Sequence, residues 1–304
     1  MIYILENEIK QSTWVDDYID GLVKGLQFIG EPYECTYDVP KPKENQRKDK
    51  LIVVHHHDQL LEELRDFRGI KIGHAHATSA IPYFQQVNRR AEQRALSFYL
   101  NYLTTTLPIT KKIIEKSGII PDNYGAEVVQ TGFPYDLSKL DGYKTKNKKE
   151  RIAIAGRLDA DKNFYTSAYL LEYYLDKYEI VFYMANPDYD LPYDLSRFED
   201  LGFIFKSIPR RQYLKELAES EIIFTASLAD TGNISLVEAL YLGCYPVVPR
   251  YPDNHCGFNH IVNRGYIPFY PKSIDSLIMC QPEVEVDLHW YNPAYVAKNI
   301  RNMR

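Results

Sequence analysis

The chain has 304 residues, enough for two domains of ordinary size, and its 45% hydrophobic and 25% charged residues are typical of a soluble globular protein. Its net charge of −5 arises in residues 151–304, because the first 150 residues carry 21 Lys or Arg and 21 Asp or Glu. No run approaches the roughly 18 apolar residues of a membrane span, and the N-terminus lacks the basic start of a signal peptide. With no CxxC motif among Cys35, Cys244, Cys256 and Cys280, we expect reduced thiols in a cytoplasmic protein, or in the host cytoplasm for a viral source.

Short β-like runs alternate with helical patterns in the first half of the chain. Strands are predicted at Ile2–Leu5, Leu51–His55, Ile70–Gly73, Tyr99–Thr104 and Glu127–Gln130. Helices are predicted over residues 15–30, 58–69 and 109–118, each closed by a glycine that can cap it. This alternation is typical of a parallel sheet with crossover helices.

A polar stretch, residues 137–150, is predicted to be a linker, and the β/α alternation restarts after it. Further strands are predicted at residues 151–156, 179–186, 202–207, 221–227 and 245–249. We therefore expect two α/β domains, residues 1–146 and 147–304, with a C-terminal tail that can pack back on the first domain. The basic runs Lys41–Lys50 and Lys144–Arg151 are either solvated loops or a surface for acceptor phosphates.

Ligands of doubly wound domains bind at the carboxyl ends of the strands. No strand is followed by GxGxxG or GxxxxGK[ST], which disfavours a dehydrogenase and a P-loop phosphotransferase. The stretch TASLADTGNISLVEALYLGCYPVVP, Thr225–Pro249, instead predicts a strand end, a turn and a helix from near Asn233 to Gly243. The first amides of that helix, around Ile234 and Ser235, would form an anion site.

Two carboxylates accompany this helix. Glu238 lies inside its apolar run, where a buried charge requires fixed partners, and ribose hydroxyls would supply them. Asp230 lies before the helix and would face the hydroxyls of a sugar. The structural alternative makes Asp230 the helix N-cap and places Glu238 in an ion pair.

Two cations follow the strand at residues 151–156, in the stretch IAIAGRLDADKNF. Arg157 and Lys162 beside a strand end suit a diphosphate, the first as a planar fork and the second as a point charge. The alternative is a pair of exposed surface cations.

Together these stretches resemble the donor-binding domain of family 4 GT-B glycosyltransferases. GRLDADK matches the family's strand followed by G-R-L and a lysine, and Ser227–Val248 matches its S-x-x-E-F-G…E-A…G-x-P-V-V pattern. Asp230 replaces the usual Glu and Thr231 the usual Phe. The phrase GCYPVVP is also similar to the subgroup that mannosylates queuosine in transfer RNA.

The first half is similar to the family's acceptor-side domain. His76, or His74 as the near alternative, matches a histidine that ends a strand, and Thr131 replaces the Asn of the family's N-G segment. The glycine-rich loop after the first strand is missing, since ENEIKQSTW stands there.

The resemblance implies a GT-B architecture, two Rossmann-like domains facing a central cleft, and a retaining transferase that uses a nucleotide-sugar co-substrate and no metal. It assigns the transferred sugar to Asp230, a catalytic role to His76 and the ribose to Glu238. The diphosphate is assigned to Arg157, Lys162 and the backbone of Gly232, Asn233, Ile234 and Ser235. A nucleic-acid base is one acceptor compatible with the basic runs.

Three other interpretations remain open at this point. One is a catalytically degenerate GT-B nucleotide-binding scaffold. Another is a metal-dependent GT-A enzyme that uses a DxD motif at Asp159–Asp161 or Asp188–Asp190. The third is a metal site built from His55, His57 and their neighbours.

Overall fold

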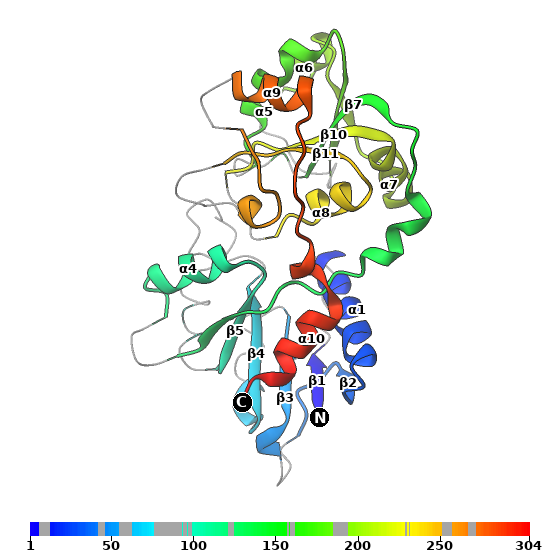
Figure 1. The fold of residues 1–304 in the computed structure, drawn as a ribbon. Helices are drawn as coiled ribbons and strands as arrows, with labels where there is room; N and C mark the ends of the chain where they lie inside the picture. The colour runs from blue at the N-terminus through cyan, green and yellow to red at the C-terminus, as the bar shows by residue number, and fades with distance from the viewer. Residues whose placement is uncertain are drawn as a thin grey trace. The chain divides into compact units, whose positions relative to one another are not determined.

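The computed structural model describes residues 1–5, 13–41, 46–54, 63–75, 93, 96, 99–120, 125–156, 158, 162–184, 194–228, 230, 232–250, 257–266 and 272–304 (Figure 1). The chain forms two compact units, Met1–Asp136 with Leu288–Arg304, and Leu137–Asp287. The division therefore lies before the boundary expected at residue 146, and the C-terminal segment belongs to the first unit.

The first unit contains a parallel sheet in the order β2-β1-β3-β4-β5-β6. Its strands are β1 (Ile2–Leu5), β2 (Tyr33–Thr36), β3 (Lys50–Val53), β4 (Ile70–Ala75), β5 (Tyr102–Thr105) and β6 (Glu127–Gln130). Every strand predicted for this half is present within a few residues. The edge strand β2 was not predicted, because its half-exposed residues lack a continuous apolar run.

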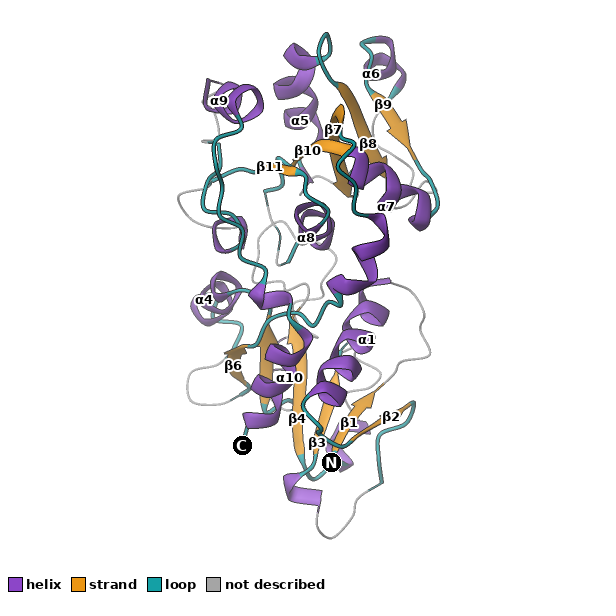
Figure 2. Cartoon of the chain, turned by 45° about the vertical axis from the view of Figure 1, so that its right-hand side comes forward, coloured by secondary structure: helices purple, strands orange, loops and turns teal. Residues whose placement is uncertain are grey.

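The described helices of the first unit are α1 (Thr13–Phe28), α4 (Pro108–Lys116) and α10 (Pro293–Asn302), with short 3-10 segments at Gln46–Lys48, Glu63–Asp66 and His289–Tyr291. Helices α1 and α10 pack side by side (Figure 2). A Cβ atom at Gly25 would lie 2.2 Å from the Pro293 carbonyl oxygen, so a glycine is needed for this approach. Of the helix predicted over residues 58–69, the described part is only the 3-10 turn Glu63–Asp66.

The second unit has a five-stranded parallel sheet in the order β11-β10-β7-β8-β9. Its strands are β7 (Lys149–Gly156), β8 (Glu179–Met184), β9 (Ile204–Lys206), β10 (Ser220–Phe224) and β11 (Tyr245–Val247). The chain proceeds from β7 to β8 on one side and later places β10 on the other side. The topological switch point therefore lies between the carboxyl ends of β7 and β10.

The helices of this unit in the described residues are α5 (Phe164–Leu171), α6 (Ser196–Asp200), α7 (Arg210–Glu219), α8 (Ile234–Tyr241) and α9 (Lys272–Cys280), with 3-10 segments η3 (Leu137–Tyr143), η5 (Glu172–Tyr174) and η6 (Gly257–His260). Each unit buries its own apolar core, built for example around Leu51 and Leu103 in the first and Ile152 and Phe224 in the second.

The predicted linker, residues 137–150, is folded into the second unit. Its 3-10 segment η3 contacts α7 and α8, and the Tyr241 hydroxyl donates to Asp141 Oδ1 at 2.7 Å. Lys148 Nζ donates to the carbonyl oxygens of Ala218 at 2.7 Å and Leu242 at 3.0 Å. Polar composition alone indicated a linker, but these side chains satisfy carbonyl groups and thereby fasten the segment.

Among the described residues, no helix combines the length and the apolar character that a membrane crossing requires. The cysteines among them, Cys35, Cys244 and Cys280, form no disulfide with one another.

Candidate functional site

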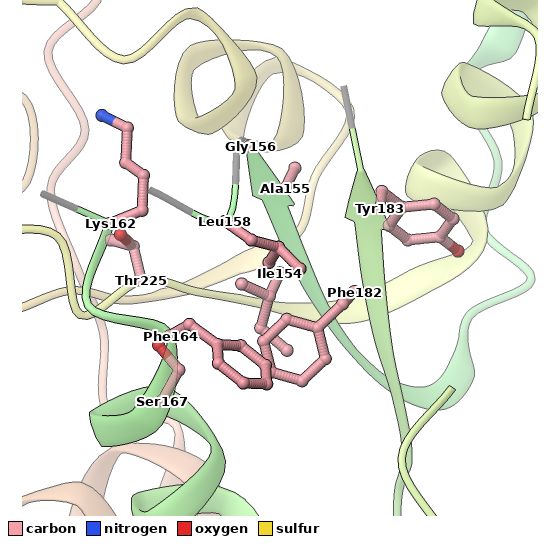
Figure 3. Close-up of a pocket in the computed structure, with 10 residues that line it drawn as sticks. All are labelled: Ile154, Ala155, Gly156, Leu158, Lys162, Phe164, Ser167, Phe182, Tyr183 and Thr225. Carbon is pink, nitrogen blue, oxygen red and sulfur yellow. The ribbon is translucent and has the colours of Figure 1, made fainter. Parts of the chain in front are cut away.

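A pocket lies at the carboxyl end of β7, next to the switch point of the second unit. It is lined by Ile154, Ala155, Gly156, Leu158, Lys162, Phe164, Ser167, Phe182, Tyr183 and Thr225. Figure 3 shows the Phe164 and Phe182 rings side by side, with the Lys162 side chain extended away from them. Gly156 ends the strand with a φ of 147°, a conformation that residues with a Cβ atom rarely adopt. A glycine is therefore required where the chain leaves β7.

Lys162 and Asp230 meet at this edge of the sheet. Lys162 Nζ donates to Asp230 Oδ2 at 2.9 Å, and the Gly232 amide donates to Asp230 Oδ1 at 3.2 Å. Lys162 precedes α5, whereas Asp230 follows β10, so the ion pair spans the switch point. Both side chains are largely buried, which leaves their attraction less screened than that of a surface pair.

The helix predicted after Asp230 is α8, and its N-cap is Asn233. The Asn233 side-chain oxygen accepts a hydrogen bond from the Leu236 amide at 2.8 Å. The alternative in which Asp230 caps the helix is therefore wrong, since Asp230 accepts from Gly232 instead. Helix geometry leaves the amides of Ile234 and Ser235 without an acceptor four residues earlier in the helix, so they point toward the region before α8.

Glu238 is fully buried within α8 and forms an ion pair with Arg210. Arg210 Nη1 donates to Glu238 Oε2 at 2.9 Å, and Nη2 donates to Oε1 at closer range. This two-pronged arrangement is the fork geometry that a guanidinium offers a carboxylate. Without any ligand, then, Glu238 has the ion-pair partner that the structural alternative required.

Sequence reasoning missed Arg210, although a signal was present. Arg210 and Arg211 stand at the start of α7, directly after Pro209, where the helix dipole disfavours a cation. A cation retained at a helix N-terminus suggests a specific anionic partner. The guanidinium lies 5.3 Å from the Tyr213 ring, and half of the Arg210 side chain, 51%, remains exposed.

Tyr213 lies beneath the Arg210–Glu238 pair. Burial raises the pKa of Tyr213 well above its ordinary value, and the nearby Glu238 charge adds to the rise. The phenol therefore stays protonated at every ordinary pH. Tyr213 therefore offers the Arg210 guanidinium an uncharged aromatic face.

Several residues predicted from the sequence lie outside the described residues: His76, Arg157, Thr231, the histidines at 55–57, and the acids of both DxD motifs. His74, the alternative to His76, is described and is buried in the first unit. His74 Nδ1 lies 2.9 Å from Thr104 Oγ1, and its ring lies 4.5 Å from that of Tyr18. Within the described part of the chain, no three His, Cys, Asp or Glu side chains gather as a metal site would require.

No family model matches the chain, and no curated protein matches its sequence. Solved structures do match. Anabaena HepE, in complex with UDP and glucose, has a TM-score of 0.63 at 14% identity, covering 99% of this chain and 94% of that one. Sucrose-phosphate synthase of Thermosynechococcus elongatus has a TM-score of 0.65 at 12% identity, with 99% and 92% covered.

The pneumococcal O-GlcNAc transferase GtfA, in complex with UDP and GlcNAc, has a TM-score of 0.56 at 13% identity. This likeness covers 84% of the chain and 54% of GtfA. At such identities the likenesses establish the fold, and the resemblance to family 4 and to its queuosine subgroup stays a prediction from motifs. The GT-A fold is excluded. With its two parallel sheets, the chain has the α/β fold of the GT-B glycosyltransferases.

Proposed function

We propose that the protein is a glycosyltransferase that moves a hexosyl or pentosyl group from a nucleotide sugar to an acceptor hydroxyl, with retention of anomeric configuration. The observation that carries this proposal is the meeting of Lys162 with Asp230 at the switch point of the second sheet. In an α/β sheet this is the place where a ligand binds, and a nucleotide sugar presents a diphosphate and sugar hydroxyls there. The UDP complexes of HepE and GtfA support the same ligand class.

Lys162 would hold the diphosphate together with Arg157 and the first amides of α8. The ammonium group has three N–H donors, so Lys162 can keep its bond to Asp230 and still reach a phosphate oxygen. When the bond from the sugar carbon to the phosphate oxygen breaks, negative charge develops on the leaving nucleoside diphosphate. A cation already fixed at that position stabilises the transition state without reorganisation.

Glu238 would hold the ribose, with Arg210 as its permanent partner. A carboxylate offers about four lone-pair directions, and Arg210 uses two of them. We propose that a ribose hydroxyl donates to Glu238 while the ion pair is kept. The exposed part of Arg210 adds N–H donors on the solvent side, so the ion pair and the nucleotide would form one hydrogen-bonded network.

Asp230 would contact the transferred sugar, with His76 as the second catalytic residue. The acceptor oxygen attacks the face from which the diphosphate departs, and its proton passes to a leaving phosphate oxygen. This path retains configuration without a covalent enzyme intermediate. Because fixed cations would supply the positive charge, we propose that catalysis is independent of a metal.

The test is turnover of UDP-sugars, followed by NMR in the absence and presence of candidate acceptors. We expect release of UDP together with free sugar, and products that retain the anomeric configuration of the donor. Turnover should survive EDTA; loss of turnover that Mn²⁺ restores would contradict the proposed metal independence and identify a metal-dependent transferase. Nucleotide binding with no hydrolysis of any donor would instead identify a degenerate scaffold.

The acceptor is a separate question, and contacts of the two basic runs bear on it. Five of their cations, four of them in the second run, have partners within the chain: Lys50 with the Arg301 carbonyl oxygen, Lys144 with Asp141, Lys148 with the Ala218 carbonyl oxygen, Lys149 with Glu219, and Arg151 with Glu179. These contacts weaken the case for a nucleic-acid acceptor, so our proposal names only an acceptor hydroxyl. Salt-dependent binding of single- or double-stranded oligonucleotides would restore nucleic acid as the acceptor class.

A further inference from the structure

One face of α5 in the second unit carries a row of exposed tyrosines. Tyr165, Tyr169 and Tyr173 follow one another at intervals of four residues, which places them on the same side of the helix and its 3-10 extension. Their exposed fractions are 55%, 61% and 77%. The opposite face of α5, including Phe164 and Leu171, is buried in the core. Each of the three tyrosines therefore exposes more than half of its surface, although Tyr165 also contacts the rings of Phe164 and Phe198.

Beside the row lies a pocket between the end of α5 and helix α9. Tyr169, Leu170, Tyr173, Tyr174, Ile274 and Asp275 line it, and its volume is about 270 Å³. That volume is close to the lower end of the range for small-molecule sites, roughly 300–1,000 Å³. The exposed Met279 lies on α9, one helical turn beyond Asp275. Several of the large apolar side chains that the protein exposes are therefore gathered around one depression.

Asp275 provides the pocket with an oriented polar group. Its Oδ1 atom accepts a hydrogen bond from the hydroxyl of Tyr174, which is itself buried. Burial raises the pKa of Tyr174, so its phenol remains a donor. The bond fixes the direction of the carboxylate, and its second oxygen is available as an acceptor to a ligand in the pocket.

Charge around the pocket disfavours a polyanion. The sequence around the pocket contains three acidic residues and two basic ones: Glu172, Asp176 and Asp275, and Lys177 and Lys272. The Lys177 ammonium lies over the Tyr178 ring, 4.9 Å from its centroid, and 4.0 Å from Met279 Sδ. Proteins that stack nucleic-acid bases on aromatic rings pair those rings with a positive groove, and this surface has no excess of positive charge.

Aromatic faces combined with one acidic acceptor suit a neutral sugar. The ring C–H groups of a pyranose form an apolar face that can stack on a tyrosine, while its hydroxyls donate to a carboxylate. Tyrosine offers a large amphipathic surface and loses little conformational entropy on binding. Several tyrosines in a row can contact successive sugar units, which a single pocket cannot do.

We propose that Tyr165, Tyr169, Tyr173 and the Asp275 pocket form a binding surface for a neutral oligosaccharide. The row begins next to Phe164 and Lys162 of the donor pocket and leads away from it along α5. The inference goes beyond the proposed transferase activity, because binding at this surface uses none of the donor-pocket residues. A glycan held here would keep a polymeric acceptor or product close to the enzyme.

The test is binding of the full-length chain to an array of neutral oligosaccharides, with calorimetry on the sugars that bind. We expect binding to at least one neutral class, and an affinity at least about tenfold lower for Tyr169→Ala/Tyr173→Ala, the loss expected for about 1.4 kcal/mol of stacking. Asp275→Asn should also weaken binding. The control is Tyr37→Ala, which removes a tyrosine that is 64% exposed in the other unit and should change nothing.

Two outcomes would overturn the inference: no neutral oligosaccharide is bound, or the tyrosine variants bind as well as the unaltered protein. Binding of oligonucleotides through the same tyrosines would overturn it too, since the ligand would then be a polyanion. UDP affinity, measured on the same samples, should be equal in all variants. If the unaltered protein does not bind UDP, this result would count against the proposed transferase activity. The oligosaccharide binding would still be tested independently by the tyrosine variants.

Discussion

In the described part of the chain, the carboxyl ends of the two parallel sheets differ in charge. In the first unit, the buried polar residues described at this edge are neutral or weakly basic: His74, Thr104, Thr105, Thr106 and Thr131. In the second unit the corresponding edge carries the ion pair of Lys162 with Asp230. Nearby, Glu238 of α8 pairs with Arg210 of α7. Both sheets provide a switch point where a ligand can bind. Topology thus provides a ligand position in both sheets, whereas, among the described residues, the side chains suited to a diphosphate lie at the second sheet.

The two edges also differ in the free energy needed to bury their polar groups. Thr104 Oγ1 donates to the Gly73 carbonyl oxygen at 3.1 Å and lies 2.9 Å from His74 Nδ1, so in the described part of this edge the buried histidine is bonded by a hydroxyl rather than by a charged group. A fully buried carboxylate such as Glu238 loses its hydration and requires a cation in exchange. We expect such a buried ion pair at a position where a ligand uses it.

Replacing Lys162 should have the largest effect. We expect Lys162→Ala to lower the transfer rate about 10²–10³-fold, the usual loss when one fixed group that stabilises transition-state charge is removed. Arg157→Ala should behave similarly. Steady-state kinetics and thermal melting would be measured together, with Lys215→Ala on the exposed face of α7 as the matched control. Rates within a fewfold of the unaltered enzyme would contradict the assignment of Lys162 to the diphosphate.

Arg210→Ala should destabilise the fold, because Glu238 then keeps a buried charge without its cation. We expect a loss of about 2–3 kcal/mol in the free energy of unfolding, less than the roughly 3–5 kcal/mol for breaking a fully buried pair. The loss is smaller because half of Arg210 is exposed, so water can take over part of its role. Urea denaturation measures this change.

Two variants serve as controls for the Arg210 experiment. Arg211→Ala removes the neighbouring exposed cation and should leave the free energy of unfolding nearly unchanged. Arg210→Met/Glu238→Leu replaces the ion pair by apolar groups and should recover most of the stability lost in Arg210→Ala. If Arg210→Ala unfolds at the same urea concentration as the unaltered protein, the ion pair is not what permits Glu238 to be buried.

Glu238 and Asp230 should fail in different ways. Glu238→Gln should weaken binding of bare UDP by about 1.5–3 kcal/mol, the range for a hydrogen bond to a charged group. Asp230→Asn should leave UDP binding nearly unchanged, because Asp230 is assigned to the transferred sugar and the diphosphate to Lys162 and Arg157. It should instead lower the transfer rate, and Asp230→Glu should alter which sugar is accepted. Calorimetry with UDP and then with the intact donor separates the two roles; equal loss of UDP affinity in both variants would mean that both acids are structural.

The smallest effect is expected at the neutral edge. Thr104→Val removes the hydroxyl that lies between His74 and the Gly73 carbonyl oxygen, and should cost about 1–2 kcal/mol of unfolding free energy. UDP affinity should stay the same, since the donor residues belong to the other unit. A large drop in UDP affinity would show that the edge of the first sheet also contributes to UDP binding.

Local patterns were sufficient to predict the elements around the candidate site. The alternation of apolar runs with helical patterns located β7, β10 and α8, because backbone preference and burial act over a few residues. Helix α8 begins after Asn233 and ends at Gly243, which has a φ of 82°, as the sequence indicated, but the N-cap is Asn233 rather than Asp230. The stretch 137–150 was wrongly predicted to be a linker, since its polar side chains bond to carbonyl groups and to Tyr241, all distant in sequence.

The sequence by itself therefore determined the class of fold and the residue types at the carboxyl ends of the second sheet. Only the tertiary structure decided the partners. Lys162 meets Asp230 because β7 and β10 are neighbours in the sheet, and Arg210 meets Glu238 because α7 starts beside α8. It also assigned α10 to the first unit, where it packs against α1. The physical reason is that local patterns determine helices and strands, whereas the pairing of distant charges depends on the order of the strands and on the burial that this order produces.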